Sequence, residues 1–323
     1  MCAMRRLLGF GVVCGLACSW NAPHDNPLDP SLGGNIEGRV LTRRATGIHG
    51  AEVAVPAAGR LCRTDSTGCF LLLGLPAETT LVFFSCPGYA PDSARLGLTK
   101  GKIYSLAVYL NGLPYFEECN VTTHVYGRSW PPDPLCFLSL TATVSDSDGE
   151  PDIDSVWFEI PAVGRSGRLL FDPNTKRFVH TLWSESVPSR SLDTLVGQEV
   201  SFLVADKEGA VVTKKHPGVS RLIYELPVPV FPSGGLDTVW VDTTFVWRRF
   251  NVGFGVHYRG EVVRIEGGGP GAVAARFETP GSSDTTYRFS RALLTPGIYY
   301  WTLEAVDAFG NSSRSAEELF RVR

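Results

Sequence analysis

The sequence predicts an all-β protein of three tandem β-sandwich domains, placed after a signal peptide and a flexible tether. Apolar residues occur in short runs of strand length, and many runs alternate with polar residues at a period of two. The 34 glycines and 22 prolines supply turns between such strands, whereas only two methionines and few helix-forming runs occur. A chain of 323 residues is long enough for several cores of ordinary domain size.

Residues 1–17 have the composition of a signal peptide. Arg5 and Arg6 precede an uncharged apolar stretch of about twelve residues, which is too short to span a bilayer of ~30 Å as a helix. The end of the segment, Gly15-Leu16-Ala17-Cys18, resembles the lipobox of bacterial lipoproteins, although Leu16 lies one place nearer to the cysteine than usual. The resemblance implies cleavage before Cys18 and its lipidation with fatty acids such as palmitate. A plain secretory signal is the alternative.

Residues 18–34 are predicted to form a lipidated tether. Pro, Asn, Asp and Gly, which favour turns, are frequent there, and the apolar residues show no period. Ser19 follows the cysteine where an aspartate would suggest retention in the inner membrane. By resemblance to sorting in Gram-negative bacteria, this favours the outer membrane. The face of the membrane, periplasmic or surface, stays open.

Residues 35–112 predict a first sandwich of short strands, with Asp65 to Gly68 as a hairpin turn. An ordered series of signals runs through this segment: Ile36, Gly38, Val40, Gly50-Ala51-Glu52-Val53, Thr64-Asp65, Gly68, Phe70, Leu75-Pro76 and Pro87-Gly88-Tyr89. This order resembles the carboxypeptidase regulatory-like domain, a prealbumin-like β-sandwich whose known members are non-catalytic accessory modules. Ala77 departs from it, since the family usually has glycine there.

Residues 113–226 predict a second, Ig-like sandwich that follows a proline-rich connector around Trp130 to Pro134. Strict alternation places one set of apolar residues on the buried face of each strand. The three clearest sets are Cys136, Leu138, Leu140, Ala142 and Val144; Val156, Phe158 and Ile160; and Val200, Phe202 and Val204.

Residues 227–323 predict a third sandwich, in which Tyr299, Trp301, Leu303 and Ala305 share one face. The glycine-rich segment 267–271 is interpreted as a loop, because no helical period follows it as dinucleotide binding requires. The last part of the segment contains Leu294, Pro296, Gly297, Tyr299, Ala305-Val306-Asp307 and Gly310-Asn311-Ser312. In these residues it resembles the closing strands of a fibronectin type III or bacterial Ig-like domain.

Cleavage before Cys18 would leave five further cysteines, in a compartment where disulfides persist. Cys119 and Cys136 flank one loop and are the first candidate disulfide, with Cys62 and Cys69 as a second candidate across a hairpin. Buried, unpaired thiols are the alternative.

Asp146, Asp148, Asp152 and Asp154 are candidates for a calcium site. Their oxygens recur at alternating positions around a glycine turn, as in calcium loops. The EF-hand pattern is incomplete, because Trp157 stands where its last glutamate belongs. An Asp-rich turn without an ion is the structural alternative.

The sequence offers no sign of catalysis or of a cofactor. The GxSxG and HExxH signatures are absent, and the six histidines are scattered without a metal-binding spacing. A net charge of −3 without a basic block argues against nucleic acid as a partner. Trp157 is predicted to be the most exposed candidate among the tryptophans for stacking on a sugar or a peptide.

These patterns favour a non-catalytic, membrane-anchored envelope lipoprotein that serves as a structural, adhesive or spacer module, with a protein or a glycan as its partner. The alternative is a carbohydrate- or peptide-binding accessory subunit of an envelope hydrolase or transport system. An enzyme built on a sandwich would need convergent acid and base groups, which the sequence does not display.

Overall fold

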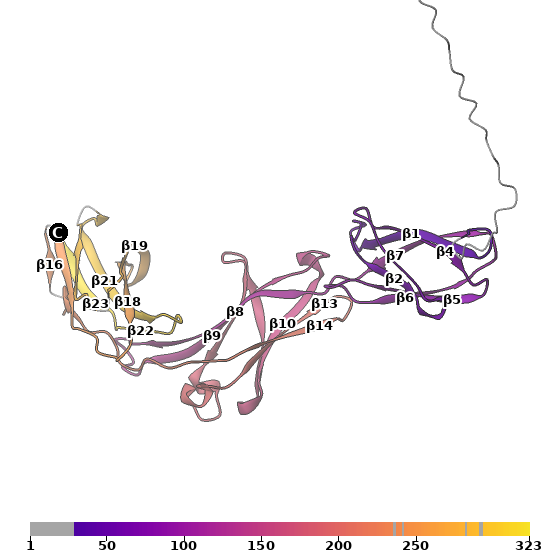
Figure 1. Ribbon diagram of the computed structural model, residues 1–323. Helices are drawn as coiled ribbons and strands as arrows, with labels where there is room; N and C mark the ends of the chain where they lie inside the picture. The colour runs from indigo at the N-terminus through magenta and orange to yellow at the C-terminus, as the bar shows by residue number, and fades with distance from the viewer. Residues whose placement is uncertain (1–28, 235–236, 241, 282, 291–292) are drawn as a thin grey trace, which may run out of the picture. The chain divides into compact units, whose positions relative to one another are not determined.

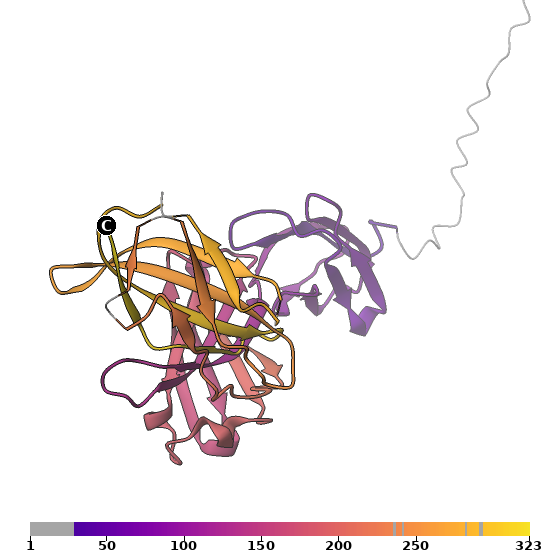
Figure 2. The same cartoon turned by 90° about the vertical axis from the view of Figure 1, so that its left-hand side faces the viewer.

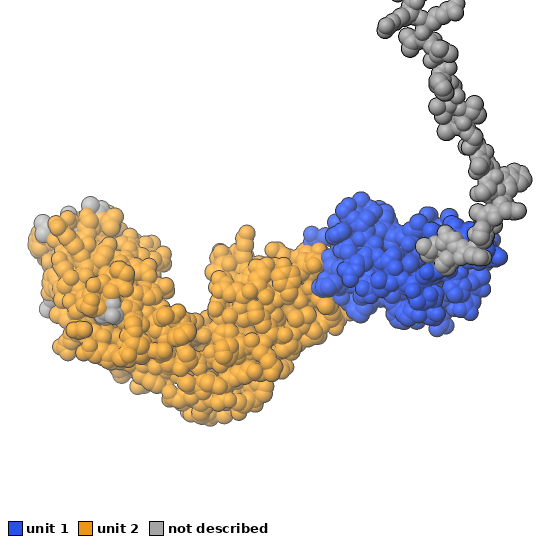
Figure 3. All heavy atoms as spheres, in the orientation of Figure 1, with its two compact units in different colours: residues 1–110 blue, residues 111–323 orange. Residues whose placement is uncertain are grey.

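The structure, a computed structural model, describes residues 29–234, 237–240, 242–281, 283–290 and 293–323 (Figure 1). The expected signal peptide, the lipidation site Cys18 and most of the expected tether lie outside these residues. The chain divides into two compact units, Met1–Leu110 and Asn111–Arg323, which Figure 3 colours separately. Nearly all of the regular structure is strand, which confirms the predicted all-β class. No helix in the described ranges is long and apolar enough to cross a membrane.

The first unit is a sandwich of two sheets. One sheet has the order β4-β1-β7 and the other β3-β2-β5-β6, and β1 pairs with β7 in parallel. A short 3-10 helix, η1 (Pro56–Ala58), separates β2 from β3. The strands are β1 (Gly34–Thr42), β2 (Glu52–Val55), β3 (Arg60–Arg63), β4 (Cys69–Leu75), β5 (Thr79–Ser85), β6 (Asp92–Gly97) and β7 (Ile103–Leu110).

Alternation determines which side of each strand enters this core. In β5, every second residue of Thr79–Ser85 is buried, so that Val82 and Phe84 point inward. They pack against Ile36 and Leu72 from the other sheet. The core therefore lies between the two sheets, as a sandwich requires.

The turn from Asp65 to Gly68 differs from its prediction as a hairpin. It connects β3 and β4, which pair with strands of different sheets. Asp65 Oδ1 accepts hydrogen bonds from the backbone N–H groups of Thr67 and Cys69, at 2.8 and 2.9 Å. The Gly68 carbonyl accepts from Val40 N at 2.9 Å, and this contact places the turn against β1. The turn residues were predictable, but the pairing partners were not.

The second unit begins with a single sheet of seven strands in the order β14-β13-β10-β11-β12-β9-β8. Its strands are β8 (Tyr115–Tyr126), β9 (Leu135–Ser145), β10 (Ile153–Ile160), β11 (Arg165–Asp172), β12 (Arg177–Trp183), β13 (Val200–Asp206) and β14 (Val211–His216). The 3-10 helices between them are η2 (Glu150–Asp152), η3 (Pro161–Val163), η4 (Ser184–Ser186) and η5 (Leu192–Leu195).

The core of this sheet is formed by the residues that the alternation predicted. Leu138, Leu140, Phe158 and Phe202 are all completely buried. The sheet folds over this core, so that its two end strands approach each other, and Lys214 Nζ on β14 donates a hydrogen bond to the Phe116 carbonyl of β8 at 3.2 Å. Cys136 lies at the margin of the core and is half-buried.

The rest of the second unit is a further sandwich, whose strands Figure 2 presents in orange and yellow. One sheet has the order β15-β17-β20, and the other contains β19-β18-β21 with β22, β23 and β16. The strands are β15 (Pro229–Phe231), β16 (Thr238–Val239), β17 (Thr243–Trp247), β18 (Val256–Glu266), β19 (Gly269–Thr279), β20 (Thr286–Phe289), β21 (Gly297–Asp307), β22 (Ser312–Arg314) and β23 (Glu318–Val322).

Aromatic rings fill this third core. The Phe245 ring stacks on Phe289, with centroids 5.0 Å apart, and lies 4.7 Å from the ring of Trp301. Trp301 is completely buried, as predicted, and its indole N–H donates to the Pro232 carbonyl at 2.7 Å. The glycine-rich segment is a tight turn at Gly267 and Gly268 between β18 and β19, with no helix after it.

A main-chain ladder joins these two cores within the second unit. Strand β22 pairs with β21 on one side and with β8 in parallel on the other, so that β8 and β9 extend from beside β22 into the folded seven-stranded sheet (Figure 1). The pairs across the joint are Ser312 with His124, Ser313 with Val125 and Arg314 with Tyr126. A single sheet of 13 strands therefore runs through both cores.

Buried side chains reinforce this joint. Asn311 Oδ1 accepts a hydrogen bond from the backbone N–H of Thr123 at 3.0 Å, and its Nδ2 donates to Asp307 and Ser220. Arg221 forms an ion pair with Asp307 at 3.4 Å. Asn311, Asp307 and Thr123 are at most 3% exposed, so these polar groups depend on one another for their hydrogen bonds.

Candidate functional site

An acidic cluster lies in the second unit at one end of its first sheet. Asp146 and Asp148 follow β9, Asp152 ends η2, and the three carboxylates have oxygens within 4.8 Å of one another. Asp206, at the end of β13, lies close enough to raise the pKa of both Asp146 and Asp152. These four residues are called the acidic cluster below.

The turn after β9 brings the first three carboxylates together. Asp146 Oδ1 accepts from the Asp148 N–H at 2.7 Å, and the Asp146 carbonyl accepts from Gly149 N at 2.9 Å. Gly149 has φ +100°, a backbone conformation that residues with a side chain rarely adopt. The chain then forms η2, in which Asp152 N donates to the Gly149 carbonyl. The turn therefore directs carboxylates from both of its sides to one place.

Two other segments complete the surroundings of the cluster. Asp206 is 3% exposed, and its carboxylate accepts from Ala210 N at 2.8 Å and from Asn111 Nδ2 at 2.7 Å. Gly112 N donates to Asp148 Oδ2 at 2.6 Å. A methyl group at Gly112 would lie 3.1 Å from oxygens of Asp146 and Asp148, so the backbone passes directly over the carboxylates.

The electrostatics of the cluster are unfavourable for bare carboxylates. Burial is the main cause that raises the pKa of Asp146 and of Asp152, and neighbouring carboxylates raise it further, although the Asp148 N–H bond opposes this at Asp146. Lys207 opposes this effect at Asp152, but it ranks below the like charges there. Three buried oxygen atoms, Asp146 Oδ2, Asp152 Oδ2 and Asn111 Oδ1, have no hydrogen-bond partner.

The cluster differs in membership from the sequence expectation. Of the four calcium candidates, Asp146, Asp148 and Asp152 lie close together, whereas Asp154 lies outside them on β10, where it is exposed. Asp206 and Asn111 were not predicted. Each stands in a turn-like motif, Asp206-Lys207-Glu208-Gly209 and Asn111-Gly112, but only the pairing of β10 with β13 brings the two acidic turns to the same end.

The five described cysteines are free and half-buried. The expected Cys119–Cys136 disulfide is not formed: the residues lie on neighbouring strands, but Cys119 pairs with Ala142 and Cys136 with Val125. Six residues of register separate them, which is about 20 Å of strand and far beyond disulfide reach. Cys62 and Cys69 belong to different sheets and are also unpaired. Burial raises the pKa of Cys119 to about 11, so this thiol is unreactive at neutral pH.

A row of aromatic side chains crosses the outer face of the sheet at the joint. Trp183 on β12 pairs with Phe137 on β9, with ring centroids 5.1 Å apart, and Phe137 stacks on His124 of β8 at 4.8 Å. Tyr126 lies 5.1 Å from Phe137. These four residues are called the aromatic row. Trp183 is its most exposed member, whereas Trp157, predicted to be exposed, is half-buried because strands flank β10 on both sides.

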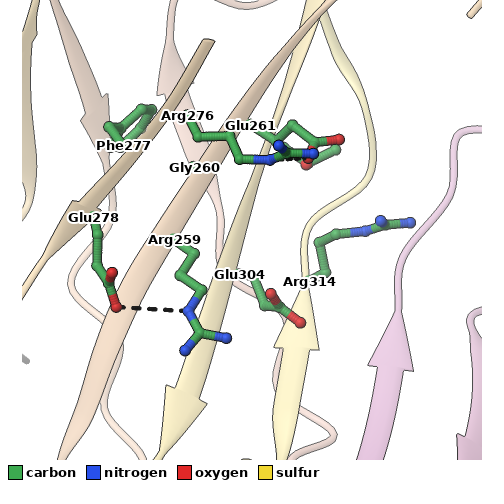
Figure 4. A pocket seen from close by; sticks show the side chains of 9 residues that line it. Arg259, Gly260, Glu261, Arg276, Phe277, Glu278, Glu304 and Arg314 are labelled. Atoms are coloured by element: carbon green, nitrogen blue, oxygen red, sulfur yellow. Dashed lines mark hydrogen bonds and ion pairs between the residues drawn. The ribbon is translucent and has the colours of Figure 1, made fainter. Parts of the chain in front are cut away.

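A row of charged residues continues the same line across β22, β21, β18 and β19 (Figure 4). The guanidinium of Arg314 lies 4.0 Å from the centre of the Tyr126 ring, and the Tyr126 hydroxyl donates to Glu304 at 3.1 Å. Beyond Glu304, Arg259 points toward Glu278, with 3.5 Å between their nitrogen and oxygen atoms. These four charged residues are called the charged row, and they line a shallow hollow of 510 Å³.

Hydrogen bonds connect the two rows. His124 Nδ1 lies 2.8 Å from Ser312 Oγ, which donates to Glu304 at 2.6 Å. Burial lowers the pKa of His124, and the charge of Glu304 opposes this shift. Burial, and then Glu304, raise the pKa of Tyr126 to about 12. Both side chains are therefore neutral at pH 7 and act as hydrogen-bonding groups with flat apolar faces.

These observations define an all-β protein of tandem sandwiches with an acidic cluster and a polar-aromatic sheet face. The sequence matches no protein-family profile and no curated protein. Among solved structures, the FN1-FN3 domains of chicken CNTN1 are 12% identical with a TM-score of 0.32, and the match covers 86% of this chain and 92% of that one.

Two bacterial structures are similar at the same level. The fibronectin(III)-like modules of Clostridium thermocellum CbhA are 8% identical with a TM-score of 0.28, over 65% of this chain and 93% of that one. A candidate carbohydrate binding protein from Bacteroides uniformis is 12% identical with a TM-score of 0.23, over 57% and 96%.

Proposed function

We propose that this chain is a non-catalytic, lipid-anchored protein of the cell envelope that serves as a structural, adhesive or spacer module. The observation that carries the proposal is the ladder between β8 and β22. This ladder joins the strands around the two cores of the second unit into one continuous sheet. Domains joined only by a linker usually move against each other. A spacer benefits from the opposite property, because a stiff joint holds its outer end away from the anchor.

The composition of the joint supports this role. Asn311, Asp307 and Thr123 are buried and satisfy one another's hydrogen bonds, so bending the joint would expose or break them. Such groups resist small rotations better than apolar contacts do, because hydrogen bonds weaken steeply with misalignment. The joint therefore favours one arrangement of the two cores.

The anchor of the proposed spacer is Cys18. Two or more acyl chains bind a bilayer stably, whereas a single chain is marginal. We therefore assign the membrane as one partner of the protein, with the outer membrane favoured by Ser19 after the cysteine. The partner at the other end is a protein or a glycan of the envelope.

The first prediction concerns this anchor. Mass spectrometry of the protein from the membrane fraction is expected to find residues 1–17 missing and acyl chains on Cys18. The Cys18→Ala variant is expected to lack the acyl mass and to leave the membrane fraction almost completely, because no second anchor is proposed. A wild-type protein that is soluble and unacylated would contradict the anchored role and favour a secreted module.

The aromatic and charged rows favour a second candidate function, carbohydrate binding by an accessory subunit. Sugar rings have apolar faces that stack on aromatic side chains, and their hydroxyls pair with Arg and Glu. The rows offer both kinds of group on one outer sheet face, with Trp183 42% exposed beside Phe137. A peptide ligand is the competing occupant.

This second function predicts that Trp183→Ala weakens binding to an oligosaccharide array by about tenfold or more, because a stacking face is lost. Trp240→Ala is the matched control, since Trp240 is 59% exposed but lies outside both rows. An array without any bound glycan, or an equal loss in both variants, would contradict carbohydrate binding at this face. Binding to peptides alone would identify the other occupant.

A further inference from the structure

We propose that the acidic cluster binds a calcium ion, with Asn111 as an additional oxygen ligand. The ligands would come from four separate segments: the start of the second unit, the turn after β9, the η2 helix and the end of β13. This site goes beyond the spacer role, and it depends neither on the lipid anchor nor on the aromatic and charged rows.

The first support is the convergence of the carboxylates. Asp146, Asp148 and Asp152 each offer an oxygen within 4.8 Å of the others, which is the spacing of atoms around a shared cation. Asp148 and Asp206 are only 7% and 3% exposed, so the carboxylates converge in a largely buried place. Concentrating negative charge away from water is unfavourable, and a divalent cation would offset it.

The second support is independent of the charges and comes from Asn111. This side chain is 8% exposed, and its Oδ1 atom is buried without a hydrogen-bond partner. Its Nδ2 atom donates to Asp206 at 2.7 Å, which places the amide against the cluster. Gly112 packs directly over Asp146 and Asp148, so the chain enters the unit at the same place. An unpaired amide oxygen in this position is a ready ligand for a hard cation.

The two unpaired carboxylate oxygens complete the pattern. Asp146 Oδ2 and Asp152 Oδ2 are buried and accept no hydrogen bond, whereas Asp146 Oδ1 and Asp206 Oδ1 accept the backbone hydrogen bonds that build their turns. Asp146 therefore has one oxygen engaged in the turn and one without a partner. Leaving such buried atoms without a partner is unfavourable, and a cation would supply one.

The ligand chemistry selects calcium among biological cations. The four aspartates and Asn111 all offer oxygen, and neither histidine nor cysteine belongs to the group of three converging carboxylates, so zinc and copper are disfavoured. Calcium accepts six to eight oxygens at irregular angles, with water filling the remaining positions. Magnesium demands a strict octahedron and retains much of its water, which suits convergence from four segments less well.

Titration of the purified full-length protein with calcium chloride tests the site by calorimetry and by thermal unfolding. At a calcium concentration about 100-fold above the dissociation constant, the unfolding temperature of the second unit is expected to be higher than in EDTA by about 5 °C or more. Magnesium chloride at the same concentration is expected to give a smaller shift. Equal unfolding in calcium and EDTA, with no heat of binding, would overturn the proposal.

Substitutions separate a calcium site from a purely structural cluster. Asp146→Asn is expected to abolish the calcium shift, yet to leave unfolding in EDTA unchanged or higher, because it removes repulsion between carboxylates. Asp154→Asn, nearby but outside the cluster, is the matched control and should retain the full shift. Loss of stability by Asp146→Asn in EDTA, together with a retained calcium shift, would assign the cluster a structural role only.

Discussion

Replacing Asn311 by alanine is expected to destabilise the second unit by about 2–4 kcal/mol and to uncouple its two cores. The substitution leaves the Thr123 N–H without its acceptor in a completely buried position and removes a donor from Asp307. Each buried polar group that loses its partner costs about 1–3 kcal/mol. Because Asn311 lies where β21 turns into β22, the loss falls on the joint between the cores.

Chemical unfolding followed by fluorescence measures this effect. Wild-type protein is expected to unfold its two joined cores in one transition, whereas Asn311→Ala should separate that transition into two. Asn120→Ala is the matched control, because Asn120 lies on β8 but its side chain donates only to Glu118 in an exposed bond at 2.7 Å. Equal stability losses in the two variants would show that the ladder alone, without Asn311, holds the joint.

Gly260→Ala, which adds one methyl group, is expected to lower the free energy of unfolding by about 2 to 3 kcal/mol. Gly260 lies in the middle of β18, and a Cβ atom there would be 2.0 Å from the ring of Phe277 on β19. That ring stacks on Tyr287 at 4.3 Å, and its centroid lies 5.8 Å from that of Phe245 and 6.4 Å from that of Trp301, so displacing it would disturb the packing of several aromatic rings. Overpacking of a filled core costs this amount.

Gly255→Ala provides the comparison for Gly260→Ala. A Cβ atom at Gly255 meets no atom within 4 Å, so alanine is expected to be neutral or to stabilise by about 0.4–1 kcal/mol through the unfolded chain. Urea unfolding of the two variants measures the difference. If Gly260→Ala were as stable as Gly255→Ala, the Phe277 ring would have to occupy another position than the one described.

The sequence predicted the local structure because alternation is a local property. A strand buried on one face needs an apolar residue at every second position, and this pattern located Leu138 to Val144, Phe158 and Phe202 correctly. The turn after β9 was equally visible, because aspartate and glycine favour that backbone. Three of the four predicted calcium candidates therefore belong to the acidic cluster.

The pairing of strands was decided only by the tertiary structure. Every residue except proline offers the same backbone N–H and C=O groups, so a ladder such as β8 with β22 leaves no signature in the residue types. The register of β8 and β9 likewise leaves no signature in the residue types. The predicted Cys119–Cys136 disulfide was therefore wrong, because this register separates the two cysteines.

The cluster shows the same division between sequence and structure. The sequence alone determined an all-β chain, its buried faces and an acidic turn at residues 146–152. Asp206 and Asn111 joined that turn only through folding, because β10 pairs with β13 and the chain enters the unit beside them. A site that gathers side chains from distant segments depends on long-range pairing, and local patterns of residues do not encode such pairing.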